Sequence, residues 1–154
     1  MFEHMDKKVK EDWVEALRSG QYEQKRGNLM TQQLYSGATE YCCLGVLCDA
    51  VLEIGHYTDN DNNEEEMFDT LDWFQSQDEN YLQNPEEAYE SSSSLPVMLR
   101  QHLGLSQEEV SALIHLNDGV QCDDNPTGRQ HTFSEIANIL SDGYLTIKGD
   151  NNDV

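Results

Sequence analysis

The chain has 154 residues, of which 30 are Asp or Glu and 9 are Lys or Arg, giving a formal charge of −21 at pH 7. This charge repels nucleic-acid phosphates, so we expect no direct binding to DNA or RNA. No apolar run approaches the ~20 residues needed to cross a bilayer, so we also expect no membrane association. The length suits a single domain over residues 1–154. We expect this domain to lie in the cytoplasm, where its four cysteines stay reduced.

The first predicted element is an amphipathic helix that ends near Arg18. Asp6 is a suitable N-cap, and Gly20 is a suitable stop. The apolar face of this helix consists of Val9, Trp13, Ala16 and Leu17. Between residues 21 and 40 the helical period is lost, and turn-forming glycines predict a small β-hairpin near residues 28–41.

Residues 41–54 predict a buried helix at the centre of the fold. Apolar side chains point in most directions and leave only a narrow stripe of Cys42, Gly45, Asp49 and Glu53. A glycine within a helix costs about 1 kcal/mol relative to alanine. We therefore expect another backbone or a ligand to approach closely at Gly45.

An acidic insertion is predicted at about residues 57–94, where we count twelve acidic residues and no Lys or Arg. Three capped helices follow it. Pro96 lies in the first turn of one helix, and capping boxes pair Ser106 with Glu109 and Thr132 with Glu135. A short strand is predicted at residues 144–147, before a polar tail from about 148. These patterns predict a mainly α fold, a compact bundle of four or five helices around the central helix with at most a small β-hairpin.

The cysteines suggest metal binding or thiol catalysis, and the patterns around them favour neither. Zinc-type ligands are present at Cys42, Cys43, Cys48, His56 and Cys122, but no C-x-x-C or H-x-x-x-H pair is found. The run from Asp59 lacks the glycine and the closing carboxylate of a calcium loop. We therefore predict no metal and no cofactor. Cys42 or Cys43 in a first helical turn could act as a nucleophile, yet Asp49 and Glu53 oppose thiolate formation, so a non-enzymatic role is favoured.

Several motifs give the chain a resemblance to an uncharacterised family of small bacteriophage and bacterial proteins. The motif residues are Trp13, Leu17-Arg18-Ser19-Gly20, Tyr22 and Gln24, then YCCLGVLCD at residues 41–49, and Leu116-Asn117-Asp118 ahead of Phe133, Ile136 and Ala137. The resemblance covers both flanks of the chain. It implies a phage or mobile-element origin, and so a host-cell cytoplasm, without implying an activity.

Six residues are candidates for contact with a ligand or partner, namely Arg18, Tyr22, Gln24, Cys42, Asn117 and Asp118. Their polar members either hydrogen-bond the segment 21–40 and the helix ends, or converge on a pocket beside Cys42 and Gly45.

Three functional hypotheses follow from these patterns. The first is an acidic accessory protein that binds stoichiometrically to a host protein with a basic surface, inhibiting or decoying a nucleic-acid-binding or defence component. The second is a protein that sequesters a nucleotide or signalling molecule in a pocket lined by Arg18, Tyr22, Gln24 and Cys42. The third is a cysteine-dependent hydrolase.

Overall fold

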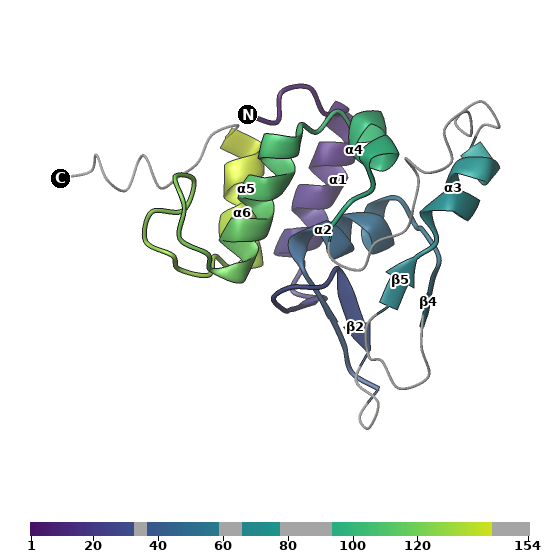
Figure 1. Cartoon of the computed structure of the whole chain (residues 1–154), viewed down its shortest axis with the longest axis horizontal. Helices are drawn as coiled ribbons and strands as arrows, with labels where there is room; N and C mark the ends of the chain where they lie inside the picture. Colours follow the sequence, from purple (N-terminus) through teal and green to yellow (C-terminus); the bar gives the residue numbers. More distant parts are fainter. Residues whose placement is uncertain (33–36, 59–65, 78–93, 143–154) are drawn as a thin grey trace.

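The computed structural model describes residues 1–32, 37–58, 66–77 and 94–142. Its helices are α1 (Lys7–Arg18), α2 (Cys43–Val46), the π-helix η1 (Leu47–Val51), α3 (Thr70–Gln77), α4 (Val97–Leu103), α5 (Gln107–Asp118) and α6 (Phe133–Asp142). Its strands are β1 (Glu23–Gln24), β2 (Met30–Gln32), β3 (Thr39–Tyr41), β4 (His56–Thr58) and β5 (Glu66–Phe68). The helices α1, α4, α5 and α6 gather in one part of the molecule, and the strands and α3 lie in the other (Figure 1).

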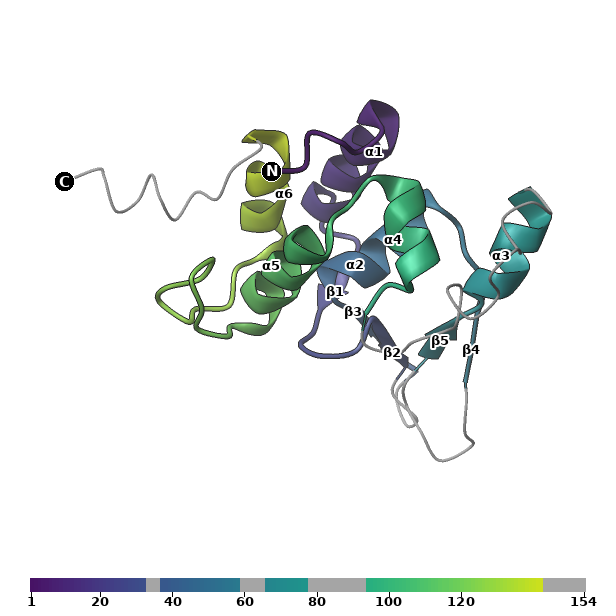
Figure 2. The ribbon, with the colours of Figure 1, turned by 45° about the horizontal axis from the view of Figure 1, so that its top comes forward.

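The prediction of a mainly α bundle is wrong, because the described residues contain two small sheets and form a mixed α/β fold. In the first sheet, β2 and β3 make the antiparallel hairpin expected near residues 28–41, with Met30 opposite Tyr41. β1 then adds in parallel to the other edge of β3, below α2 in the view of Figure 2. The second sheet, β4 with β5, falls in the predicted acidic insertion. Strands of two or three residues are too short to give the alternating pattern that reveals strands in a sequence.

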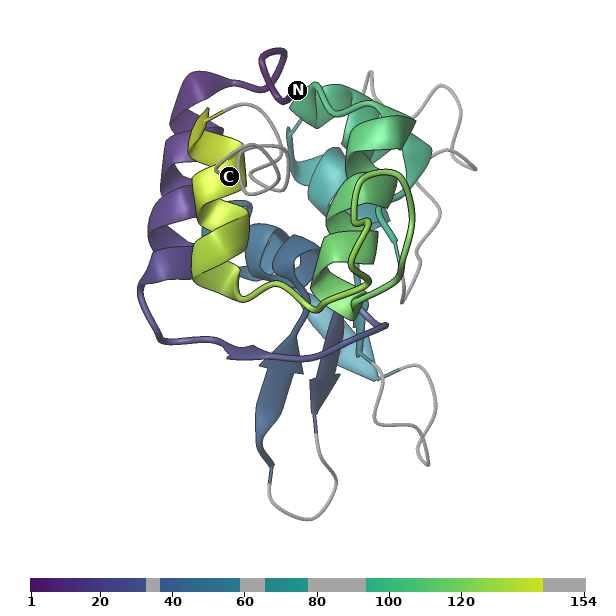
Figure 3. The same cartoon turned by 90° about the vertical axis from the view of Figure 1, so that its left-hand side faces the viewer.

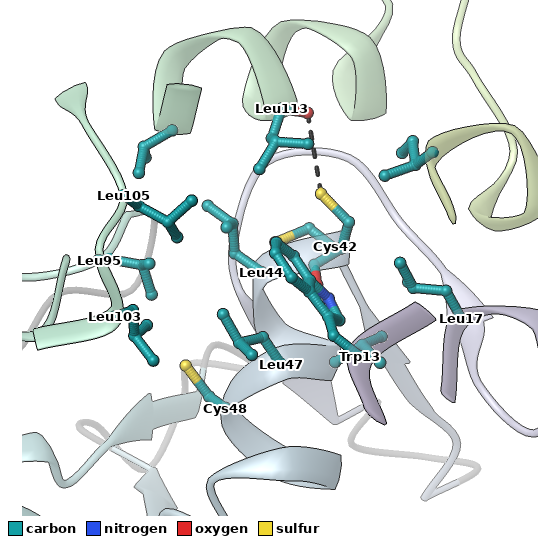
Figure 4. Packing of buried hydrophobic residues seen from close by; sticks show 14 of the residues in the cluster. Trp13, Leu17, Cys42, Leu44, Leu47, Cys48, Leu95, Leu103, Leu105 and Leu113 are labelled. Atoms are coloured by element: carbon teal, nitrogen blue, oxygen red, sulfur yellow. Dashed lines mark hydrogen bonds between the residues drawn. The ribbon is translucent and has the colours of Figure 1, made fainter. Parts of the chain in front are cut away.

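The central helix is present, but it begins at Cys43 rather than Tyr41, which belongs to β3. From Leu47 it continues as a π-helix, in which the amide of Leu52 donates to the carbonyl of Leu47 over 3.1 Å. Every residue of α2 is buried. Side chains from α1, α5 and the residues around α4 surround the helix, including Trp13, Leu113 and Leu103 (Figure 4).

The predicted caps of α1, α5 and α6 agree with the structure, whereas Pro96 is the N-cap of α4 instead of a residue in its first turn. Asp6 accepts a hydrogen bond of 3.0 Å from the amide of Val9. The boxes of Ser106 with Glu109 and of Thr132 with Glu135 each have both reciprocal bonds. Glu109 uses its second oxygen to accept from the amide of Phe2, whose buried side chain joins the core.

Other predictions concern residues outside the described part of the chain. They are the terminal strand at 144–147, the polar tail from 148, the acidic run at 59–63 and most of the insertion between 78 and 93. Within the described residues, none of the helices has the length and apolar character that a bilayer crossing requires.

Candidate functional site

The thiols of the central helix are packed into the core. Cys43 and Cys48 are 0% exposed, and Cys43 directs its thiol at the carbonyl of Leu113 over 3.8 Å. Burial raises the pKa of the Cys42 thiol to about 11, although the amides of Gly45 and Leu44 oppose part of this effect. Burial also raises the pKa of Cys43 and of Cys48 well above the usual range. Because the thiolate is the nucleophilic form, this environment does not favour thiol catalysis.

We predict that only one thiol of the folded protein reacts quickly with Ellman's reagent near pH 7.5. That thiol is Cys122, which is half-buried, whereas Cys42, Cys43 and Cys48 should react at least about 100-fold more slowly, after local opening. Absorbance of the released thiolate measures the rates, and Cys122→Ser should remove the fast phase. A second fast thiol in the Cys122→Ser variant would contradict the burial described above.

Asn117 lies at the centre of a buried hydrogen-bond network and is 0% exposed. Its side-chain oxygen accepts from the amide of Cys43 over 3.1 Å and from the side chain of Gln24 over 3.0 Å. Its side-chain nitrogen donates to the carbonyl of Lys25 over 2.7 Å and to Asp118 over 2.9 Å. One side chain thus joins the end of α5 to the start of α2 and to the residue after β1.

Gln24 and Asp118 extend the same network. Gln24 also donates to the carbonyl of His131 over 2.8 Å, and Asp118 accepts from the amide of Gly27 over 2.9 Å. The side chains of Gln24, Asn117 and Asp118 therefore form hydrogen bonds with the segment after α1 and with the helix ends. This is the first of the two interpretations given above for the polar candidate residues.

Arg18 and Tyr22 lie apart from this network. Arg18 donates to the side chain of Asn138 on α6 over 2.7 Å. The Tyr22 hydroxyl is 3.4 Å from a carboxylate oxygen of Asp49, and its ring packs edge-on against Tyr41 with centroids 5.0 Å apart. Burial, followed by the charge of Asp49, raises the pKa of Tyr41 to about 12. The six candidate residues thus do not line one pocket.

The close approach expected at Gly45 is made by backbone. A Cβ atom at this position would lie 1.8 Å from the carbonyl oxygen of Leu29. The same carbonyl accepts from the amide of Cys42 over 3.1 Å. The glycine therefore allows the segment before β2 to cross the central helix, and the narrow stripe on this helix is filled at Gly45.

A groove of about 520 Å³ lies between α1 and the end of η1, and we call it the acidic groove. Its carboxylates are Asp12 and Glu15 from α1 and Glu53 from the turn after η1. The other lining residues are Ala16, Ser19, Gln21, Tyr22, Ala50 and Val51. Asp12 is paired with Lys8 over 2.9 Å, whereas the carboxylates of Glu15 and Glu53 have no ion-pair partner among the described residues.

Glu53 has a backbone conformation that is unusual for its residue type. Its φ angle is +52°, in the left-handed region that glycine and asparagine occupy most easily. A residue other than glycine in this conformation costs on the order of 1–3 kcal/mol. Its exposed carboxylate nevertheless lies in the acidic groove.

Sequence reasoning missed most of the acidic groove. Asp12 and Glu15 look like ordinary solvated positions of an amphipathic helix, and the stripe on the central helix suggests for Glu53 only an electrostatic effect on the cysteines. No pattern in the sequence predicts that the backbone of Glu53 adopts a left-handed conformation. Among the described residues, no three His, Cys, Asp or Glu side chains cluster closely enough to hold a metal ion.

Fold and site together define a small mixed α/β domain built around a buried, thiol-rich helix, with an acidic groove beside it. The protein belongs to the family described as "Domain of unknown function (DUF8296)", whose model matches residues 5–143. The match includes α1 and η1, which form the acidic groove. Comparisons with curated proteins and with solved structures found no match.

Proposed function

We propose that the protein acts by stoichiometric binding, with the acidic groove receiving basic side chains of a partner protein. The observation that carries this proposal is Glu53. Glu53 ends the central helix at φ +52°, where glycine or asparagine would cost less, and its carboxylate forms no ion pair with the described residues, which leaves it available to a basic side chain of a partner.

The charge of the whole chain supports a partner with a basic surface. Acidic residues outnumber basic ones 30 to 9, which favours rapid encounter with a positive surface. Surfaces of this kind are typical of nucleic-acid-binding proteins. Together with the resemblance to bacteriophage proteins, this makes a host nucleic-acid-binding or defence protein the partner that we propose, with the chain competing against DNA.

The test uses a panel of purified bacterial nucleic-acid-binding proteins, with affinity measured by calorimetry at low and moderate salt. At least one protein should bind in a 1:1 ratio, release DNA on binding and lose affinity as salt is added. Glu53→Asn should weaken this binding about tenfold while raising the free energy of unfolding by about 1 kcal/mol. If Glu53 serves binding at a cost in stability, the same substitution should weaken binding and stabilise the fold.

Two control variants separate charge from conformation and position. Glu53→Gln removes the carboxylate but keeps the backbone cost, so it should weaken binding without stabilising the fold. Asp123→Asn removes the same charge from an exposed loop outside the groove and should change neither quantity appreciably. Absence of any binder at low salt, or equal losses in the Glu53 and Asp123 variants, would count against the acidic groove.

A further inference from the structure

A second, larger groove of about 1030 Å³ follows the outer face of α1, and we call it the α1 groove. α1 lies beside α6 at one edge of the helical part of the molecule (Figure 3). Met5 and Val14 contribute largely buried apolar side chains to this groove. Its charged residues are Glu3, Lys7, Lys10, Glu11, Glu15 and Arg18. Those on α1 lie at positions 7, 10, 11, 15 and 18, a spacing that places them along one stripe of the helix.

The α1 groove is electrically balanced in a chain that is otherwise strongly negative. It contains three acidic and three basic residues, whereas the whole chain has 30 acidic and 9 basic residues. Two copies of the chain repel each other over most of their surfaces. The repulsion between two copies at this face is therefore lower than the net charge of the chain would give.

The order of the charges along α1 makes the groove complementary to itself. When two α1 helices lie antiparallel with Lys10 opposite Glu11 of the second copy, Lys7 comes opposite Val14 of that copy and beside its Glu15. Glu3, which precedes the helix, then lies at the end where Arg18 of the second copy arrives. Each pair occurs twice because of the two-fold symmetry, so Lys7, Lys10, Glu11 and Glu15 all come near an opposite charge. Glu3 and Arg18 already bond to the N-terminal amine and to Asn138 within the chain.

The side chains at the centre of this arrangement are available for such pairing. Lys7, Glu11 and Glu15 form no ion pair with other described residues, and all three are exposed. Lys10 donates only to the backbone carbonyl of Phe2, over 3.1 Å. Pairing with a second copy thus breaks no ion pair of these four residues in the described chain.

We propose that the α1 groove is a self-association surface, through which two copies form a symmetric dimer with antiparallel α1 helices. α1 has 12 residues and is thus ~18 Å long, so its contact is smaller than the ~800 Å² per partner of a standard interface. The dimer is therefore weak and depends on concentration. It requires only this chain and no other partner, but the α1 groove shares Glu15 and Ser19 with the acidic groove.

The test is a charge exchange across the proposed interface, followed by analytical ultracentrifugation at ~0.15 M salt, where repulsion beyond about 8 Å is screened. The wild-type chain should show a monomer–dimer equilibrium. The variant Lys7→Glu/Lys10→Glu and the variant Glu11→Lys/Glu15→Lys should each be monomeric, because like charges then face each other. A 1:1 mixture of the two variants should form a heterodimer, because every exchanged pair is again opposite in sign.

A control variant makes the same change of net charge as Lys7→Glu/Lys10→Glu at positions outside the α1 groove. Lys8→Glu/Arg26→Glu alters two exposed basic residues outside the α1 groove and should still dimerise. Circular dichroism of each variant checks that α1 remains folded. A wild-type chain that stays monomeric at all concentrations would overturn the proposal, and so would folded charge-exchanged variants that fail to associate when mixed.

Discussion

Replacing Asn117 with Leu is expected to lower the free energy of unfolding by about 3–5 kcal/mol. The side chain is 0% exposed and makes four hydrogen bonds. Its loss leaves the buried amide of Cys43 and the partly buried carbonyl of Lys25 without their Asn117 bonds, and an unpaired buried group costs more than the average hydrogen bond. Urea denaturation followed by circular dichroism measures the change.

Two further variants keep the Asn117 prediction testable even if Asn117→Leu does not fold. Gln24→Ala removes a side chain that donates to Asn117 and to His131, so a smaller loss of about 1–2 kcal/mol is expected. Asn138→Leu makes the same chemical change at an exposed position of α6 and should change stability by less than about 1 kcal/mol. Equal effects at positions 117 and 138 would show that the network contributes little.

Gly45→Ala is expected to destabilise the fold by about 3 kcal/mol or more, and the variant is expected to accumulate poorly as a folded protein. The added Cβ would lie 1.8 Å from the carbonyl oxygen of Leu29, which is backbone and cannot rotate away. The substitution must therefore displace either the central helix or the segment before β2. Thermal unfolding of the purified variant, or its soluble yield if it cannot be purified, gives the measurement.

Gly55→Ala is the matched control for Gly45. A Cβ at Gly55 meets no atom within 4 Å, and its backbone is outside the left-handed region. We expect a change below about 1 kcal/mol, because only the entropy of the unfolded chain is altered. If Gly45→Ala were as stable as Gly55→Ala, the crossing of the Leu29 backbone over the central helix would be disproved.

The helices could be predicted from the sequence because their signals are local. Helix caps involve residues only three positions apart, as at Asp6, Ser106 and Thr132. A glycine within a helix likewise indicates a close contact, as at Gly45. The parallel pairing of β1 with β3 could not be predicted, because its register depends on contacts across the fold rather than on its two-residue sequence.

The candidate site was harder to predict than the fold. The polar character of Gln24, Asn117 and Asp118 was visible, but whether they face a ligand or one another depends on how distant segments meet. Asn117 bonds the carbonyl of Lys25, 92 positions away. The acidic groove likewise combines α1 with the turn after η1, and the conformation of Glu53 has no signature in its neighbours.

The packing of α1 against α6 has a consequence for how the chain matures during synthesis. These are the first and last helices of the described chain, and Arg18 on one is bonded to Asn138 on the other. The contact between α1 and α6 therefore cannot form on the ribosome until α6 has emerged from the exit tunnel. A nascent chain stalled before that point exposes apolar surface, which makes it a client for chaperones.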